Sequence, residues 1–202
     1  MLLFLLAESF LKLPQVLCKM DLKTDTRVHY HGADGVYAGI TSDGILKLYW
    51  GESKLFQTAS DAIRECLASL KPFLTESEHE GAERERDLIL LSDKADLSDV
   101  RLTNALKGYF DKNSVMSNRR RYCGVALIGF DGAFYPREGK KGVANDIAAA
   151  ARKELGKWKK RVGARLKKEK LEQIEIELFC LPLPSADGFR DAFLSAMGLK
   201  TT

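Results

Sequence analysis

Apolar and polar residues between positions 34 and 54 follow the pattern of a β-hairpin. Two strand-like runs, 36–40 and 45–50, flank a turn that ends in Gly44. Three-residue hairpin loops commonly need a glycine in the left-handed conformation at this place. Such a loop fixes the register, so we expect Ile40 to face Leu46, and Val36 to face Trp50 on the same side of the hairpin.

Apolar periodicity in the rest of the chain predicts alternating helices and strands. The expected helices are 2–13, 60–74 with Ser60 as its N-cap, 104–111, 143–169 and 187–197, and the expected strands are 15–22, 87–92, 122–130 and 175–181. Within 143–169 the predicted inward stripe comprises Leu155, Trp158, Val162 and Leu166. This order predicts an α/β fold with a mixed central sheet and flanking helices. We expect one domain, 1–202, with a core of about 1–92 and an αβ elaboration of about 93–202.

The predicted register also places two carboxylates opposite each other. The pairing that joins Val36 to Trp50 continues to Asp34 and Glu52, and Lys54 follows on the same face. Opposed side chains lie about 5 Å apart, so the two charges repel unless one is protonated, a lysine offsets them or a cation lies between them. Mg²⁺ binds one or two carboxylates together with water and substrate phosphates. Asp34 and Glu52 are therefore candidate ligands of Mg²⁺, with Mn²⁺ as a substitute.

An aspartate that opens one strand, followed by Glu-x-Lys on the next, resembles the PD-(D/E)xK nucleases. The resemblance implies a restriction-endonuclease-like core in which Asp34 and Glu52 hold the metal. Lys54 would then position or activate the attacking water. Ala33 stands where these nucleases often have proline. Glu8 on the first helix would, by the same resemblance, reach the metal site; the alternative is an ordinary exposed glutamate.

A second Glu-x-Lys sequence occurs at Glu138 to Lys140. It follows Pro136 in a stretch rich in Gly and Lys without a strand pattern, so we expect a loop there. Near the candidate site, His29 and His31 are either metal ligands or loop residues. Gln57 either lines the site or forms a turn.

Four stretches resemble a narrower family: GADGVYAG (32–39), the segment 46–74, DLILLSDKADL (87–97) and YCGVALIGFD (122–131). Together they are similar to HamA, the nuclease subunit of the bacterial Hachiman anti-phage defence system. The likeness extends from about position 5 to the C-terminus and implies a metal-dependent DNA nuclease restrained by a helicase partner, HamB. It also implies further sequence before the first helix. The chain has no phosphate-binding Gly-x-x-x-x-Gly-Lys-Ser/Thr motif, so we expect any ATP-driven step to belong to a partner.

Positive charge is concentrated late in the chain, although the net charge is only +4. Twelve Lys or Arg and three acidic residues lie between 140 and 170, whereas 75–99 is mostly acidic. The candidates for contacts with DNA phosphates are Lys153, Lys157, Lys160, Arg161 and Arg165. The alternative is a solvated helix surface without a partner.

Cysteine spacing and hydropathy favour a cytoplasmic protein. The four cysteines lie far apart, which indicates reduced thiols. The N-terminal apolar run has no preceding basic residue and is interrupted by Glu8, and no stretch reaches the roughly 20 apolar residues of a membrane helix.

Three functions remain open on the sequence. The first is an Mg²⁺-dependent nuclease. The second is a non-catalytic module that binds DNA or a partner through the basic helix of 140–170. The third makes Asp34, Glu52 and Lys54 a structural ion-pair cluster.

Overall fold

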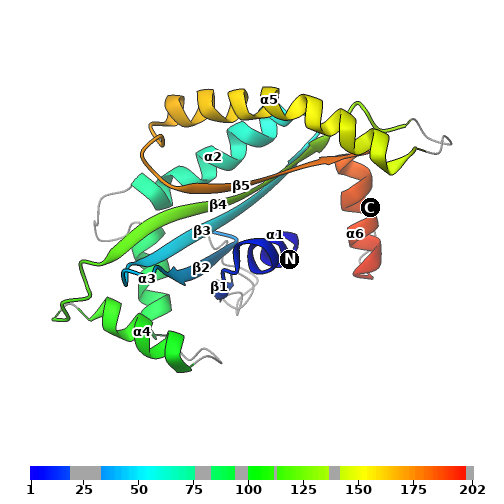
Figure 1. The fold of residues 1–202 in the computed structure, drawn as a ribbon. Coiled ribbons are helices and arrows are strands. Elements are labelled where there is room, and N and C mark those ends of the chain that lie inside the picture. Colours follow the sequence, from blue (N-terminus) through cyan, green and yellow to red (C-terminus); the bar gives the residue numbers. More distant parts are fainter. Residues whose placement is uncertain (19–32, 76–82, 94–99, 112, 137–141, 199–202) are drawn as a thin grey trace. The chain divides into compact units, whose positions relative to one another are not determined.

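The computed structural model describes residues 1–18, 33–75, 83–93, 100–111, 113–136 and 142–198. Five strands form one sheet in the order β1-β2-β3-β4-β5 (Figure 1). They are β1 (Gln15–Cys18), β2 (Gly35–Ile40), β3 (Leu46–Phe56), β4 (Arg120–Asp131) and β5 (Ile176–Leu183). The helices are α1 (Leu2–Leu6), the π-helical segment η1 (Ala7–Leu11), α2 (Ala59–Thr75), α3 (Glu83–Asp93), α4 (Val100–Phe110), α5 (Ala144–Glu169) and α6 (Ala186–Ala196).

The sheet is mixed, as the sequence predicts. β1, β2 and β3 are antiparallel neighbours. At the start of β3 the Leu46 amide donates to the Arg119 carbonyl, and at its end the Gln57 carbonyl accepts from the Asp131 amide. The two strands β3 and β4 therefore run in the same direction, and equivalent bonds to Glu175 and Leu183 make β5 parallel to β4. The α/β class with a mixed sheet and flanking helices is confirmed.

The chain divides into two compact units. One unit comprises Met1–Glu52, Ser69–Ala126 and Gln173–Glu177. The other comprises Ser53–Ala68, Leu127–Glu172 and Leu178–Thr202. The single domain with a core of 1–92 stays a prediction. Among the described residues, no helix combines the length and apolarity that a membrane crossing needs.

The hairpin has the predicted register. Val36 pairs with Trp50, and Ile40 pairs with Leu46. Gly44 has a φ of 74°, a left-handed conformation that other residues adopt only at a cost. Its carbonyl oxygen accepts a 2.7 Å hydrogen bond from the Tyr109 hydroxyl, which ties the turn to α4. One side of the hairpin thus enters the core, where Leu46 and Trp50 are both 0% exposed.

The segment 87–92 is not a buried strand but part of the helix α3. The prediction is wrong because four consecutive apolar residues fit a buried strand and a helix equally well. Asp87 and Leu91 lie one helical turn apart and are only 3% and 2% exposed, whereas Ile89 is 54% exposed. The crossover from β3 to β4 contains the three helices α2, α3 and α4 and, in its described part, no strand.

Three smaller expectations also need correction. Thr58, not Ser60, caps α2: its hydroxyl oxygen accepts from the Asp61 amide at 3.1 Å and donates to the Asp61 carboxylate at 2.7 Å. Leu155 is 41% exposed and does not belong to the inward stripe of α5. β1 ends at Cys18, and positions 19–22 of the predicted strand lie outside the described residues.

The four cysteines are free thiols, as expected from their spacing. Cys66 and Cys123 are buried. Burial, followed by the nearby Glu175 charge, raises the pKa of the Cys123 thiol to about 12. A thiol with this pKa is protonated at neutral pH and serves as an apolar core residue.

Candidate functional site

Asp34 and Glu52 lie at the open end of the β2–β3 hairpin. The last pair of the ladder joins Gly35 to Gly51. Asp34 precedes β2 by one residue, and its backbone amide donates to the Gly51 carbonyl at 2.9 Å. Contact between the two chain segments therefore continues beyond the ladder, but the bond goes to Gly51, which already pairs with Gly35, and not to Glu52. The pairing of Asp34 with Glu52, on which the predicted metal site depends, stays a prediction.

The burial of the two carboxylates differs. Glu52 is only 6% exposed, whereas Asp34 is half-buried. Burial, together with the nearby Asp34 charge, raises the pKa of the Tyr37 phenol above its ordinary value of 10.0. Lys54 follows Glu52 by two residues on β3, on the same side of that strand, and is half-buried. A carboxylate as buried as Glu52 keeps its charge only beside a cation or several hydrogen-bond donors.

The donor set fits a hard divalent cation bound through two carboxylates. Among the described residues no group of three or more His, Cys, Asp or Glu side chains converges. Mg²⁺ does not need such a group, because it retains several waters and also takes oxygens from substrate phosphates. His29 and His31 lie outside the described residues.

Glu8 lies on η1 and is exposed. Leu3 and Leu13, which flank this segment, contact the hairpin where glycines leave room: a Cβ would lie 3.1 Å from Leu3 at Gly51 and 2.9 Å from Leu13 at Gly39. Both glycines point to the face opposite that of Glu52, because neighbouring strand residues alternate. The N-terminal segment therefore packs on the face of the hairpin opposite Glu52. A catalytic role for Glu8 stays a prediction without support from this packing.

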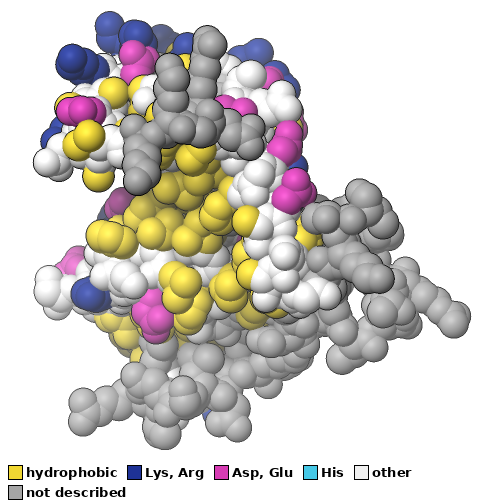
Figure 2. Space-filling model, turned by 90° about the vertical axis from the view of Figure 1, so that its right-hand side faces the viewer, with side chains coloured by type: hydrophobic (Ala, Val, Ile, Leu, Met, Phe, Trp, Pro, Cys, Tyr) yellow, Lys and Arg dark blue, Asp and Glu magenta, His cyan; other side chains and the backbone are white. Residues whose placement is uncertain are grey.

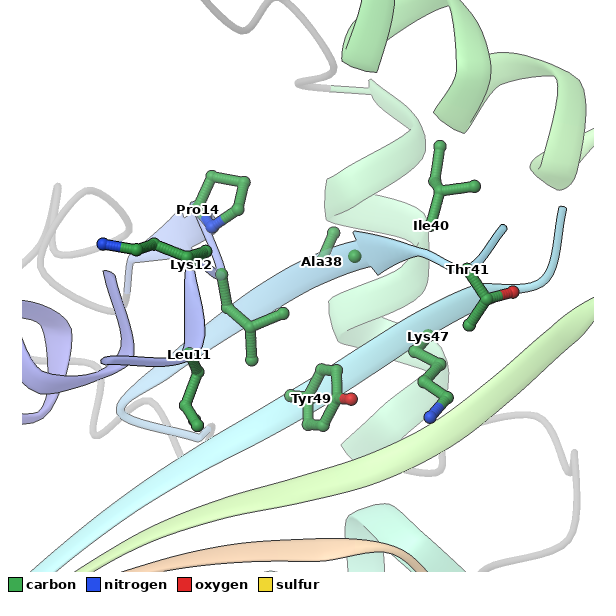
Figure 3. A pocket seen from close by; sticks show the side chains of 10 residues that line it. Leu11, Lys12, Pro14, Ala38, Ile40, Thr41, Lys47 and Tyr49 are labelled. Atoms are coloured by element: carbon green, nitrogen blue, oxygen red, sulfur yellow. The ribbon is translucent and has the colours of Figure 1, made fainter. Parts of the chain in front are cut away.

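Figure 3 shows the face that the N-terminal segment does cover. A hollow of about 550 Å³ is bordered there by Leu11, Lys12 and Pro14 on one side and by Lys47 and Tyr49 of β3 on the other. This hollow lies on the opposite face of the hairpin from Glu52, so we do not assign it to the candidate site.

An ion pair on this second face was missed by the sequence analysis. Lys47 Nζ lies 2.6 Å from Glu175 Oε2, and the Tyr49 hydroxyl donates to the same carboxylate at 2.8 Å. The bonds from Lys47 and then Tyr49 hold the pKa of Glu175 below its ordinary value of 4.5, against an opposing effect of burial. Positions 47 and 175 are too far apart in the sequence for a local pattern to indicate their contact.

Two buried contacts hold β3 in place just before Glu52. The Trp50 indole Nε1 donates to Asp87 of α3 at 2.9 Å. The Arg84 guanidinium lies 4.4 Å from the centre of the Tyr122 ring, and that ring packs edge-on against Trp50. These contacts connect α3 and β4 to the strand that carries Glu52, so they help fix the position of its carboxylate.

Gln57 serves the turn after β3. Its side-chain amide donates to Asp187 at 3.0 Å, and its carbonyl accepts from the Asp131 amide. Both bonds fasten neighbouring segments to the end of the strand. The turn interpretation of Gln57 is therefore favoured.

The predicted DNA-binding residues of α5 fall into two groups. Lys153, Lys160 and Arg161 are exposed and form no ion pair with any described residue. Lys157 pairs with Glu154 at 2.8 Å, and the half-buried Arg165 pairs with Glu169 at 2.5 Å. Figure 2 shows Lys and Arg side chains along the upper edge, over α5. Three cations of the predicted five are thus open to a partner.

Comparison with known proteins identifies one family. The family model described as HamA matches residues 1–197, which is nearly the whole chain. No curated protein and no solved structure matches the chain. The family likeness predicted from the segments 32–39 and 46–74 is confirmed by this match. The chain therefore belongs to the HamA family.

Proposed function

We propose that this chain is a metal-dependent DNA nuclease that acts in anti-phage defence. Membership of the HamA family indicates the defence role and suggests a nuclease. The observation that supports the proposed chemistry is the buried carboxylate of Glu52, with Lys54 two residues further along β3. Asp34 lies just before the neighbouring strand β2, and its amide bonds to the Gly51 carbonyl.

Each of the three side chains has a distinct task in this proposal. Asp34 and Glu52 would hold Mg²⁺, which when bound supplies positive charge at the scissile phosphate and lowers the pKa of water. The Lys54 ammonium would stabilise the negative charge that grows on the phosphate oxygens during attack. Burial of Glu52 strengthens its interaction with any cation, since the surroundings are less polar than water.

We further propose that a helicase subunit, HamB-like, restrains cleavage. The family supports this partnership. The chain itself carries no phosphate-binding Gly-x-x-x-x-Gly-Lys-Ser/Thr motif. An ATP-driven release of the nuclease would therefore act from the partner.

The test is cleavage of plasmid and linear DNA in Mg²⁺ and in EDTA, by the chain alone and with a candidate helicase partner. Glu52→Ala and Lys54→Ala are assayed in parallel, after circular dichroism has shown that both variants fold. We expect Mg²⁺-dependent cutting that both substitutions abolish. Near-normal cutting by either folded variant would refute the proposed site.

A non-catalytic DNA- or partner-binding module is the second candidate. The observation in its favour is the set of open cations on α5, Lys153, Lys160 and Arg161. It predicts DNA binding that needs no metal and that Glu52→Ala leaves unchanged, without cutting under any condition. Cutting that occurs only when the partner is added to the chain would exclude this candidate and support a restrained nuclease.

A further inference from the structure

A cavity of about 600 Å³ lies at the carboxyl ends of the parallel strands β3 and β4. Ligands of open α/β sheets bind preferentially at this end of the strands. The volume lies within the range of 300–1,000 Å³ typical of small-molecule sites. The apolar wall consists of Phe130, Ala133, Phe134, Ala150 and Trp158. The cavity therefore has the place and the size of a ligand site.

The aromatic residues form a connected wall. The Trp158 ring packs edge-on against Phe130, with centroids 5.0 Å apart. Phe134 lies 6.4 Å from Trp158 at an interplanar angle of 39°. Phe130 and Trp158 are buried, whereas Phe134 is half-buried. Tyr135 stacks on one face of Phe134, with centroids 5.1 Å apart. Only the other face of the Phe134 ring is therefore left for a flat ligand.

The cavity is lined by two acids and two bases, which do not pair with one another. Asp131 accepts from the Ala186 amide at 2.6 Å, and Glu154 pairs with Lys157 at 2.8 Å, so the two acids are already engaged. Lys153 and Arg161 also line the cavity, and neither pairs with any described residue. With Lys157 counted, three positive charges face two negative ones, an excess of one positive charge, and the two unpaired cations are available to an anion.

We propose that this cavity binds one nucleotide, with its base against Phe134 and its phosphate beside Lys153 and Arg161. Aromatic rings stack on any base, and cations beside them neutralise the backbone. Lys54 lies on β3 only three residues before Gln57, another lining residue. The inference rests on the proposed function where the nucleotide belongs to a DNA strand; a free mononucleotide presents the same chemistry.

The test fills the cavity without changing charge. Ala150→Trp places a large side chain in it, and Ala149→Trp, at the exposed neighbouring position on α5, is the matched control. Ala133→Trp fills the cavity from the opposite wall, in case Ala150→Trp fails to fold. Affinity for a fluorescein-labelled single-stranded oligonucleotide is measured by anisotropy in EDTA and in a Glu52→Ala background, and free dAMP is titrated as a competitor.

We expect Ala150→Trp to lower the affinity for the oligonucleotide by at least about tenfold, which corresponds to losing the stacking of a single base. Ala149→Trp should lower the affinity by less than about twofold. Lys153→Glu and Arg161→Glu should weaken binding more than Lys167→Glu, an exposed α5 position outside the cavity. If Ala150→Trp weakens binding of the oligonucleotide but not of dAMP, the site takes a nucleotide of a DNA strand. If it weakens binding of dAMP alone, the site takes a free nucleotide. Equal affinities of the Ala150→Trp and Ala149→Trp variants for both ligands overturn the inference.

Binding is measured without metal, so its result is independent of cleavage. If the cavity variants bind DNA normally and the parent chain cuts DNA with Mg²⁺, only the proposed nucleotide site is refuted. If the cavity discriminates as expected but the parent chain never cuts, only the proposed nuclease falls.

Discussion

Glu52 is a buried carboxylate residue, with only 6% of its surface exposed to solvent. The isosteric change Glu52→Gln separates a catalytic from a structural role, because it removes the charge and keeps the shape. For a metal ligand we expect cleavage to fall at least about 100-fold and the melting temperature to stay or rise, since the substitution removes a buried charge. For a structural pair with Lys54 we expect a loss of about 3–5 kcal/mol in the free energy of unfolding.

The same experiment contains its own control in the second Glu-x-Lys sequence. Glu138→Gln alters a glutamate of the predicted loop and should leave cleavage unchanged. Mg²⁺ should raise the melting temperature of the parent and of Glu138→Gln but not that of Glu52→Gln, because only a folded site binds the ion. Loss of cleavage in Glu138→Gln with normal cutting by Glu52→Gln would transfer the metal site to the later motif.

Glu175 predicts a dependence of stability on pH. Its bonds to Lys47 and Tyr49 hold its pKa below the ordinary 4.5, so the folded state binds this proton less tightly than the unfolded chain. The resulting stabilisation is complete above 4.5 and is lost as pH falls through the lower, folded pKa. We expect Glu175→Gln to cost up to about 1 kcal/mol at pH 7, since the 41% exposed carboxylate is screened by solvent.

Chemical denaturation between pH 7 and pH 3 tests this expectation. The difference between the parent and Glu175→Gln should shrink as the solution becomes more acidic. A difference that stays constant over this range would show that the carboxylate acts through packing rather than charge.

At the residue scale, sequence reasoning succeeded where partners are close along the chain. The pairs of Val36 with Trp50 and of Ile40 with Leu46 follow from one hairpin register, which a single glycine turn determines. The site formed by Asp34, Glu52 and Lys54 stays a prediction. The bond from Trp50 to Asp87 and the pair of Lys47 with Glu175 join residues that are 37 and 128 positions apart. Such contacts depend on how helices and strands pack, which no local pattern encodes.

At the scale of elements, α3 offers a direct test of helix against strand. In a strand, Ile89 and Leu91 would share one face and be equally buried. In the helix Leu91 is 2% and Ile89 is 54% exposed. We expect Leu91→Ala to cost about 2–4 kcal/mol of unfolding free energy, and Ile89→Ala less than about 0.5 kcal/mol. Similar costs in urea denaturation would support the strand instead.

The start of α2 provides a second test. The Thr58 hydroxyl accepts a hydrogen bond from the Asp61 amide and so caps the helix, and it donates to the Asp61 carboxylate, which orients it. Thr58→Ala should lower the unfolding free energy by about 1 kcal/mol, and Thr58→Ser should restore most of it. Ser60→Ala is the control and should change stability by less than about 0.5 kcal/mol. A larger loss of stability in Ser60→Ala than in Thr58→Ala would show that Ser60 is the capping residue.

The elements differ in how well local pattern determines them. The hairpin combines alternation with a turn glycine, and two independent signals agree. The run from Leu88 to Leu91 is too short to show a period, and its polar neighbours Arg84 and Asp87 are buried by contacts with β3 and β4 that lie far away in sequence. Leu155 fits the helical stripe, but at its place along α5 the side chain remains 41% exposed.

At the scale of the whole molecule, the α/β class was predictable because helical and strand periods alternate along the chain. The order of the strands was less predictable from the sequence. β3, β4 and β5 are adjacent and parallel because long helical crossovers return the chain to the same sheet. The sequence predicted a strand at 87–92, where the chain instead continues through α3 and α4 before β4.

The distribution of charge over the whole chain leads to a last prediction. The net charge is only +4, so binding to DNA must depend on a local surface rather than on overall attraction. Each phosphate that a cation neutralises contributes about 0.9 to the slope of log K against log salt. Lys160 on α5 is exposed and unpaired among the described residues, whereas the Arg165 guanidinium is paired with Glu169.

Lys160→Ala should therefore reduce the salt slope of DNA binding by about one and weaken affinity equally for different sequences. Arg165→Ala should leave the slope unchanged, because Glu169 already neutralises that charge. Fluorescence anisotropy over a series of NaCl concentrations, with both variants in the cleavage-deficient Glu52→Ala background, measures both slopes. If neither substitution changes the slope, the outer face of α5 is a solvated surface, and any DNA must bind elsewhere on the molecule.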